Sequence, residues 1–349
     1  MPDLPDPNWY VDNVLVFAEP GRADALTDLP LARWRAWWQD QWRRLGSDPV
    51  GTVAREQGFV IASRQLREIG LSRDDARREV RRGRLWMPAR GIASPVVVPG
   101  DDWEARRRRH AITACAAALS RPDHVVDGRS AAILYGLPTV RVPVLPELTT
   151  GAPTSLGRRA RAHVFGAALK PWAMTRWFGT WAATPVRTVV DLARRDRWDG
   201  LMAADAALRE GLFTLSQVLA ATDVAIGWPG VRQARSVLSL ASPQAESPLE
   251  SITRLRLHDD GFPVPEMQVE VPDPQLDRVY RLDLLLRAQR LAIEADGKDK
   301  YTDDELWREK KRESRVRRLT DYRTERVIWT DVGREWPATR TRLRQAAGL

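Results

Sequence analysis

Two apolar runs near the carboxyl end of the chain carry carboxylates, and this feature limits the fold most. Residues 280–286 and 290–296 are typical of strands joined by a polar bend, with Asp283 on the first and Glu294 and Asp296 on the second. Because strand side chains alternate, Glu294 and Asp296 share one face while the apolar residues between them point into the core. The pattern predicts a sheet with Asp283 and Glu294 converging at one end.

Carboxylates in an apolar strand repel each other and lose hydration unless a cation or a proton lies between them. Mg²⁺ accepts one or two carboxylates and lets a substrate phosphate complete its octahedron. It polarises the phosphoryl oxygen and lowers the pKa of a bound water. We therefore expect Asp283 and Glu294 to bind Mg²⁺ or Mn²⁺ in a phosphodiesterase site, with Asp296 and Lys298 assisting.

Composition agrees with an oxygen-bound metal and an anionic partner. The chain has one cysteine and four scattered histidines, which argues against thiolate or imidazole metal sites. A net charge of +9 favours nucleic acid over membrane. The amino terminus lacks the pattern of a secretory signal and no long apolar run occurs, so we expect a cytoplasmic protein with no membrane partner.

Residues 49–98 are typical of three short helices followed by a β-hairpin. Glycines end the helices, and Ser72 and Asp75 can form a capping box at the start of the third. Residues 85–87 and 91–93 then read as a strand pair. This order predicts a winged helix-turn-helix.

Arginines crowd the third of these helices. A recognition helix would direct such guanidinium groups toward phosphates and guanine edges. We expect DNA binding here, with a merely solvated basic face as the alternative. The expected contacts are Arg73, Arg77, Arg78, Arg81 and Arg82.

Two other regions give weaker signals. Residues 1–48 hold an amphipathic helix with four tryptophans at helical spacing, which either docks on the protein body or contacts a membrane surface or nucleic acid. Residues 99–240 mix helices with short strands and predict an α/β scaffold without a chemical constellation. Asp191 and Asp205 fall in amphipathic helical patterns there, and we expect surface or capping roles for both.

The last hundred residues predict the element order α-β-β-β-α-β after a linker near residue 240. The first helix starts at Ser247, with Glu250 three residues later, and the second covers 302–319. The second helix is strongly basic, so it is either a phosphate-binding surface beside the carboxylates or a solvated helix. Its expected DNA contacts are Arg308, Lys310, Lys311, Arg312 and Arg315.

At these residues the chain resembles a known family. Asp283, followed by the run Glu294-Ala-Asp296-Gly-Lys298, is similar to the core of PD-(D/E)XK nucleases, most of all the very-short-patch-repair branch. Residues 128–136 and 184–193 resemble the AbiEi-family antitoxin-like proteins of actinobacteria, which combine a winged helix with such a domain. The resemblance covers about residues 49–332.

The resemblance implies an α+β multidomain protein that ends in a restriction-endonuclease-like α/β domain with a central mixed sheet. Asp283 matches the metal-binding aspartate and Glu294 the acidic residue of the family triplet. Asp296 occupies the position of the family lysine, and Lys298 follows just beyond. Glu250 matches a helix carboxylate that assists the metal, although a capping box explains it equally well.

These observations predict an Mg²⁺-dependent DNA endonuclease targeted by a winged helix. Because no lysine lies in register, the alternative is a non-catalytic DNA-binding regulator or antitoxin with a degenerate nuclease domain. A protein partner in a toxin–antitoxin or defence context is a third hypothesis, from family analogy alone. The predicted domains are an amino-terminal extension, the winged helix, the scaffold and the nuclease-like domain, over residues 1–48, 49–98, 99–240 and 244–349.

Overall fold

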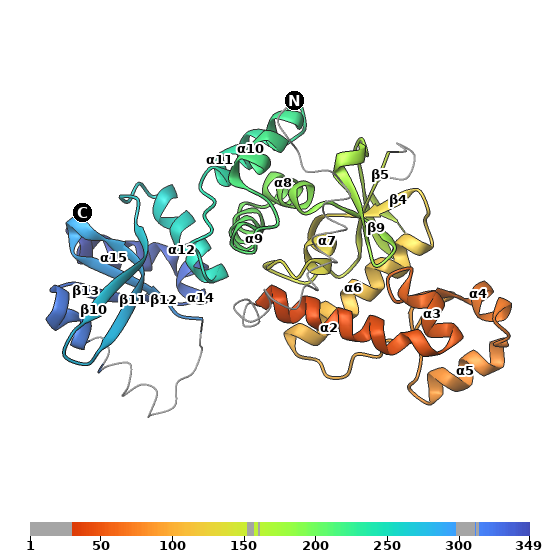
Figure 1. Ribbon diagram of the computed structural model, residues 1–349. Helices are drawn as coiled ribbons and strands as arrows, with labels where there is room; N and C mark the ends of the chain where they lie inside the picture. Colours follow the sequence, from red (N-terminus) through yellow and green to blue (C-terminus); the bar gives the residue numbers. More distant parts are fainter. Residues whose placement is uncertain (1–29, 152–156, 160, 298–310, 312–313) are drawn as a thin grey trace. The chain divides into compact units, whose positions relative to one another are not determined.

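The computed structural model describes residues 30–151, 157–159, 161–297, 311 and 314–349. The chain divides into two compact units: residues 1–203 with 210–239, and residues 204–209 with 240–349. Within the described residues, three sheets alternate with helices (Figure 1). The protein therefore has the mixed α and β, multidomain character expected from the sequence.

The first unit contains a small three-stranded sheet with the order β1-β3-β2 and antiparallel pairing. The predicted capping box forms: the Asp75 amide donates to Ser72 Oγ (3.1 Å), and the Ser72 amide donates to Asp75 Oδ2 (3.0 Å). Leu66, Val80 and Leu85 belong to the core beneath this region. The elements run in the order α3 (Pro49–Arg55), β1 (Ile61–Ala62), α4 (Ser63–Glu68), α5 (Arg73–Arg81), β2 (Trp86–Ala89) and β3 (Ile92–Ser94).

The rest of the first unit is built on a six-stranded mixed sheet with the order β6-β7-β5-β4-β9-β8. Its strands are β4 (His124–Val126), β5 (Glu147–Thr150), β6 (Gly157–Arg159), β7 (Ala162–Gly166), β8 (Met174–Trp177) and β9 (Thr180–Ala183). Its helices are α6 (Trp103–Leu119), α7 (Gly128–Leu134), α8 (Pro185–Arg195), α9 (Arg197–Arg209), α10 (Leu215–Val224) and α11 (Val231–Leu238). Residues 204–209 of α9 belong to the second unit. The mixture of helices and short strands expected over residues 99–240 is therefore present.

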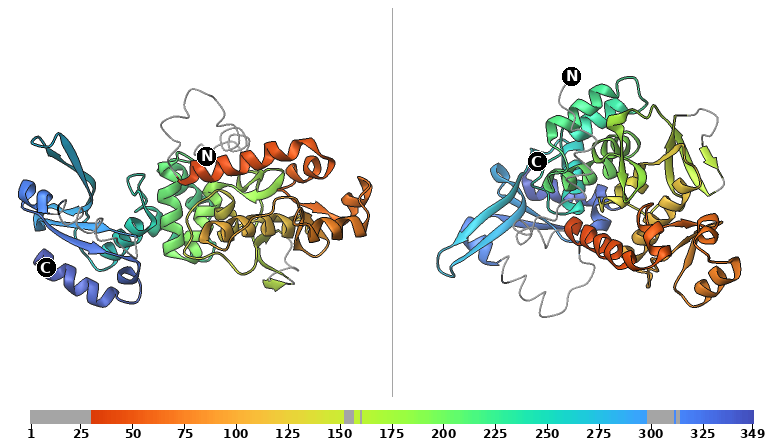
Figure 2. Two further views of the ribbon diagram at one scale, coloured as in Figure 1. Left: turned by 90° about the horizontal axis from the view of Figure 1, so that it is seen from below. Right: turned by 45° about the vertical axis from the view of Figure 1, so that its right-hand side comes forward.

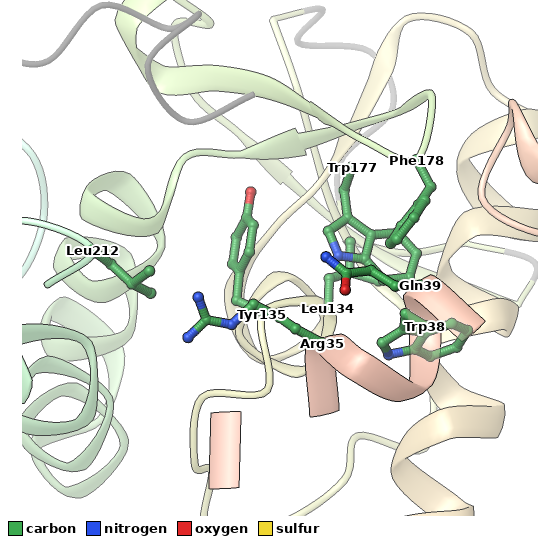
Figure 3. A pocket seen from close by; sticks show the side chains of 8 residues that line it. All are labelled: Arg35, Trp38, Gln39, Leu134, Tyr135, Trp177, Phe178 and Leu212. Carbon is green, nitrogen blue, oxygen red and sulfur yellow. The ribbon is translucent and has the colours of Figure 1, made fainter. Parts of the chain in front are cut away.

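Helix α2 (Pro30–Arg44) docks on this unit through its tryptophans. Trp34 and Trp38 are buried, and Trp34 Nε1 donates to the Leu134 carbonyl (3.0 Å). The Trp38 ring lies 5.1 Å from that of Trp177, beside a cavity of about 20 Å³ that has room for about one water (Figure 3). The structure therefore supports docking as the role of this helix.

The expectation of surface or capping roles for Asp191 and Asp205 was wrong. Asp191 is fully buried and pairs with Arg187 and Arg194 on its own helix. Asp205 is 1% exposed, and its Oδ2 lies 2.7 Å from Arg254 Nη2. Both carboxylates are buried because arginines neutralise them, and burial raises the pKa of each.

The second unit is built on a four-stranded sheet with the order β10-β11-β12-β13. The pairs β10–β11 and β11–β12 are antiparallel, and β13 runs parallel to β12. Helices α12, α14 and α15 lie on one face of the sheet (Figures 1 and 2). The elements are α12 (Pro248–Asp259), β10 (Glu266–Asp273), β11 (Arg278–Leu286), β12 (Leu291–Ala295), β13 (Arg323–Val327), α14 (Trp329–Val332) and α15 (Trp336–Ala347).

The four predicted strands of the second unit therefore form, whereas α15 was not predicted. The expected helix over 302–319 falls largely outside the described residues, although 314–320 are helical. Val316 and Leu319 from that segment pack against Leu285 and Ala292 of the sheet. In the described ranges, no helix is both long and apolar enough to cross a membrane.

Candidate functional site

The structure brings Asp283 and Glu294 to neighbouring positions on β11 and β12. Leu284 pairs with Ile293, and one further step of this antiparallel register sets Asp283 opposite Glu294. The Ala295 amide donates to Asp283 Oδ2 (2.8 Å), which ties the aspartate to the end of β12. Residues directly opposite on antiparallel strands have neighbouring side chains. The two residues therefore lie on adjacent strands, and the convergence of their carboxylates stays a prediction.

The carboxylate of Glu250 reaches the same part of the sheet from α12. Ser247 Oγ accepts from the Glu250 amide (3.2 Å), so the helix begins at the predicted cap. The Glu250 carboxylate accepts from the Glu246 amide (3.0 Å) and from Gln268 Nε2 (2.7 Å). Glu250 therefore anchors Gln268 in the described structure, a contact that the sequence did not indicate.

Gln268 lies on β10 between residues that pair with Leu282 and Leu284, beside Asp283. Its φ of 51° is a left-handed conformation that few side chains adopt. The hydrogen bond from Gln268 Nε2 to Glu250 holds the side-chain amide of Gln268 in place. Glu250 on α12 (4% exposed) and Glu294 on β12 (8% exposed) are both buried.

Asp296 follows β12 at the end of the sheet. Its amide donates to the Val327 carbonyl (2.9 Å), so the β12–β13 pairing extends one residue past the strand. Arg326 on β13 is the register partner of Glu294, and its Nε lies 3.7 Å from Asp296 Oδ2. A guanidinium group therefore lies beside the acidic residues, from a strand in which the sequence indicated no site residue.

Asp283 and Glu294 offer the carboxylate oxygens that a hard divalent cation prefers. Mg²⁺ needs only one or two protein carboxylates, because waters and a phosphate fill its other positions. Across the described ranges, no group of three or more aspartate, glutamate, histidine or cysteine side chains is close enough to hold a metal. Lys298, the expected assisting residue, lies outside the described residues.

A second candidate site lies over α4, α5 and the β2–β3 turn in the first unit. A groove of about 700 Å³, which we call the α5 groove, is lined there by five arginines: Arg67, Arg73, Arg77, Arg81 and Arg90. All five side chains are exposed. Four of them, all except Arg77, pair with no carboxylate of the described residues, so their positive charge is available to an anion. The groove joins two arginines that sequence analysis did not select, Arg67 and Arg90, to three that it did.

Other arginines of α5 are tied to acidic residues of the same segment. Arg78 pairs with Asp75, and Arg82 (3.2 Å) and Arg84 pair with Glu79. Hydrogen bonds from Ser72 lower the pKa of Asp75, and a hydrogen bond from Arg84 lowers that of Glu79. Arg77 also pairs with Asp74 (3.2 Å). The structure thus divides the predicted DNA contacts into neutralised and available arginines.

The basic helix near the carboxyl end is described only in part. Lys311 is exposed, whereas Arg308, Lys310 and Arg312 lie outside the described residues. Arg315 donates to both Asp273 oxygens (2.6 Å each), and this contact lowers the pKa of Asp273. Arg315 therefore fastens its helix to the β10–β11 hairpin in the described structure.

The chain is similar to two uncharacterized proteins of Mycobacterium tuberculosis. No family model matches the chain. Two strains of Mycobacterium tuberculosis each have a relative, "Uncharacterized protein Rv2248" and "Uncharacterized protein MT2308". Each is 31% identical over 211 residues, which are 59% of this chain and 74% of the relative.

Among solved structures, the chain is similar to that of the RV2827C protein from Mycobacterium tuberculosis. It is 17% identical, with a TM-score of 0.33, over 68% of this chain and 91% of that one. A similarity at this level carries no argument about fold or function.

Proposed function

Since the chain belongs to the family of the uncharacterized M. tuberculosis proteins Rv2248 and MT2308, whose names state no activity, we propose a function from the geometry. We propose that the protein is a divalent-metal-dependent DNA endonuclease. The second unit would be its nuclease domain, of the restriction-endonuclease-like type. A winged helix formed by α3, α4, α5 and the β2–β3 hairpin would hold the duplex.

The observation that carries this proposal is the position of Asp283 opposite Glu294. Two acidic residues on adjacent strands beside apolar core residues repel each other, so the arrangement favours an added cation. Glu250 and Gln268 support this geometry because their hydrogen bond fixes the side chains that border it. A purely structural role would be served better by apolar residues of similar size.

The chain's own residues would share the work as follows. Asp283 and Glu294 would hold Mg²⁺ or Mn²⁺, which would supply Lewis-acid stabilisation of the phosphoryl oxygens and lower the pKa of water. The Ala295 amide fixes one oxygen of Asp283 (2.8 Å) and so orients its carboxylate. Glu250 positions Gln268. Arginines of the α5 groove bind phosphates of the duplex and set its register.

Cleavage of DNA by purified protein tests this function. Supercoiled and linear duplexes are incubated with Mg²⁺, Mn²⁺ or EDTA, using wild type, Asp283→Asn and Glu294→Gln. We expect nicking with metal only, and a loss of about 10³-fold in each variant, equivalent to about 4 kcal/mol of barrier. Arg323→Ala, which changes an exposed arginine of β13, is the matched control and should cleave normally. Equal nicking by wild type and Glu294→Gln would refute the assignment.

A second candidate function rests on the α5 groove. We propose as the alternative a DNA-binding regulator of the antitoxin-like type, in which the second unit adds affinity without cleavage. The available charges of Arg73 and Arg81 in a groove of about 700 Å³ favour it. Under this alternative the wild type binds DNA but does not nick it with any metal. Unchanged DNA affinity after substitution of both arginines would argue against it.

A further inference from the structure

We propose that the guanidinium group of Arg326, on β13, binds the scissile phosphate beside Asp283 and Glu294. It would take the place of the lysine that the nuclease family has on the strand corresponding to β12. This inference rests on the proposed nuclease function and deepens it. In this chain Asp296 occupies the lysine position, so the strand that carries Glu294 contributes no cation at that position. The missing positive charge would then come from the neighbouring strand.

Strand register is the first argument. In the parallel pair β12–β13, Glu294 is the partner of Arg326, and Ala295 is the partner of Val327. Register partners in a sheet have side chains on the same face. Arg326 therefore lies on the face that carries Glu294, one strand further from Asp283.

The residue before Arg326, Glu325, lies on the opposite face of β13. Glu325 pairs with Arg342 of α15, on the face covered by the carboxyl-terminal helices. Because side chains alternate along a strand, Arg326 points away from α15. Its backbone carbonyl accepts from Arg342 Nη2 (3.0 Å), which fixes the strand at this residue.

Contact with Asp296 is the second argument. Arg326 Nε lies 3.7 Å from Asp296 Oδ2, and the two side chains are 33% and 16% exposed. An arginine held at this distance is oriented by the carboxylate while part of its guanidinium group remains open to solvent. Asp296 thereby becomes a positioning residue for Arg326, which makes the assisting role expected from the sequence specific.

The chemistry suits a guanidinium group. Arginine in proteins does not release its proton, so Arg326 cannot serve as a general base. Its planar fork matches two oxygens of a phosphate, and it can stabilise the charge that develops on them during attack by water. The proton of the attacking water must pass to solvent or to another group. Arg326 would therefore affect kcat more than KM, because its contact strengthens in the transition state.

The test compares Arg326→Ala, Arg326→Lys and the control Arg323→Ala in the full-length protein. Arg323 lies on the same strand, is exposed, and points to the other face, so it controls for loss of one positive charge. Thermal unfolding first establishes that all variants fold. Two quantities are then measured: kcat and KM for duplex cleavage with Mn²⁺, and the salt dependence of duplex binding in EDTA.

We expect Arg326→Ala to lower kcat by about 10²- to 10³-fold, as when one transition-state donor is removed, with a smaller rise in KM of at most about tenfold from the lost phosphate contact. Arg326→Lys should recover part of the rate, and Arg323→Ala should match wild type. If wild type cleaves and Arg326→Ala cleaves within about threefold of it, a difference of under 1 kcal/mol in barrier, the inference is wrong.

The binding measurement separates this inference from the nuclease proposal. If wild type does not cleave, the proposed function fails, and the role of Arg326 is judged by binding alone. A contact with phosphate predicts that Arg326→Ala reduces the slope of log affinity against log salt by about 0.9, while Arg323→Ala leaves the slope unchanged. Equal slopes for wild type and Arg326→Ala would overturn the phosphate contact.

Discussion

The α5 groove and the carboxylate site both concentrate charge, but the charged side chains are exposed in the groove and mostly buried at the carboxylate site. In the groove, five exposed arginines face solvent and their neighbours on the helix are neutralised by Asp75 and Glu79. In the second unit, Glu250 on α12 and Glu294 on β12 are buried. Exposed charge is well solvated and costs little to maintain, whereas buried charge requires partners.

This difference in burial indicates which kind of ligand each region suits. Hydrated arginines suit attraction to a polyanion, which acts over several ångströms and weakens with salt. Dehydrated carboxylates suit the binding of a hard cation, because electrostatic interactions strengthen away from water. The same contrast predicts that substitutions in the two regions will affect different quantities.

The largest effect should come from breaking a buried ion pair. Asp205→Asn leaves the guanidinium group of Arg254, whose side chain is 11% exposed, without its charged partner. We expect the free energy of unfolding of the second unit to fall by about 3–5 kcal/mol. Chemical denaturation followed by tryptophan fluorescence would measure it.

The control for Asp205→Asn is Asp321→Asn in the same unit. Asp321 pairs with Arg290 at 2.9 Å, but the side chains are 80% and 69% exposed. Its φ of 60° is one that asparagine tolerates. This substitution should change the stability by less than about 1 kcal/mol. Equal losses in the two variants would remove the contrast between buried and exposed charge.

A smaller effect is expected on DNA binding when arginines of the α5 groove are replaced. Replacing Arg73 and Arg81 by alanine removes two charges available to phosphate, and should reduce the salt slope of duplex binding by about 1.8, at about 0.9 for each contact. Replacing Arg78 and Arg82 removes charges that Asp75 and Glu79 already neutralise. Titrations by fluorescence anisotropy at several salt concentrations should show a clearly smaller change for this second pair. The same change for both pairs would show that pairing with Asp75 and Glu79 does not determine which arginines contact DNA.

The smallest effect concerns the pH dependence of the first unit. Burial lowers the pKa of His110 to about 4, and its Nε2 lies 2.8 Å from Ser130 Oγ. The unfolded chain takes up a proton below about pH 6.5, whereas the folded unit resists it, so stability should fall as the pH decreases from about 6.5. The slope from this group reaches about 1.4 kcal/mol per pH unit.

His110→Gln removes this titration while keeping a polar side chain near Ser130. Between pH 6.5 and 5.5 its stability should therefore change less with pH than that of wild type. Urea unfolding at several pH values would measure the two slopes. Parallel slopes would mean that protonation of His110 does not limit the stability of this unit.

Local signals in the sequence predicted much of this structure. Ser72 with Asp75, and Ser247 with its following proline, marked the starts of α5 and α12, because caps depend on neighbouring residues. The alternation around Asp283 and Glu294 predicted the strands that bring them together. Helix α15 was missed, although Trp336, Thr339, Leu343 and Ala347 are buried at helical spacing.

Long-range pairing explains the remaining failures. Arg326 meets Glu294 only because β13 pairs in parallel with β12, and such a pairing joins residues that are distant in the sequence. Asp205 is buried because it meets Arg254, from another helix. Gln268 joins the site through a left-handed backbone that no local pattern indicated. These residues required a three-dimensional arrangement to be recognised.

Direct titration of the protein with Mn²⁺ or Mg²⁺ in a calorimeter tests the central claim, that Asp283 and Glu294 together bind a divalent cation. The proposal predicts a saturable heat for wild type, and for Arg323→Ala, that disappears in the double variant Asp283→Asn/Glu294→Gln. Folding of the double variant is checked by thermal unfolding. A wild type that binds no metal, or a double variant that binds it as tightly as wild type, would contradict the assignment of this site.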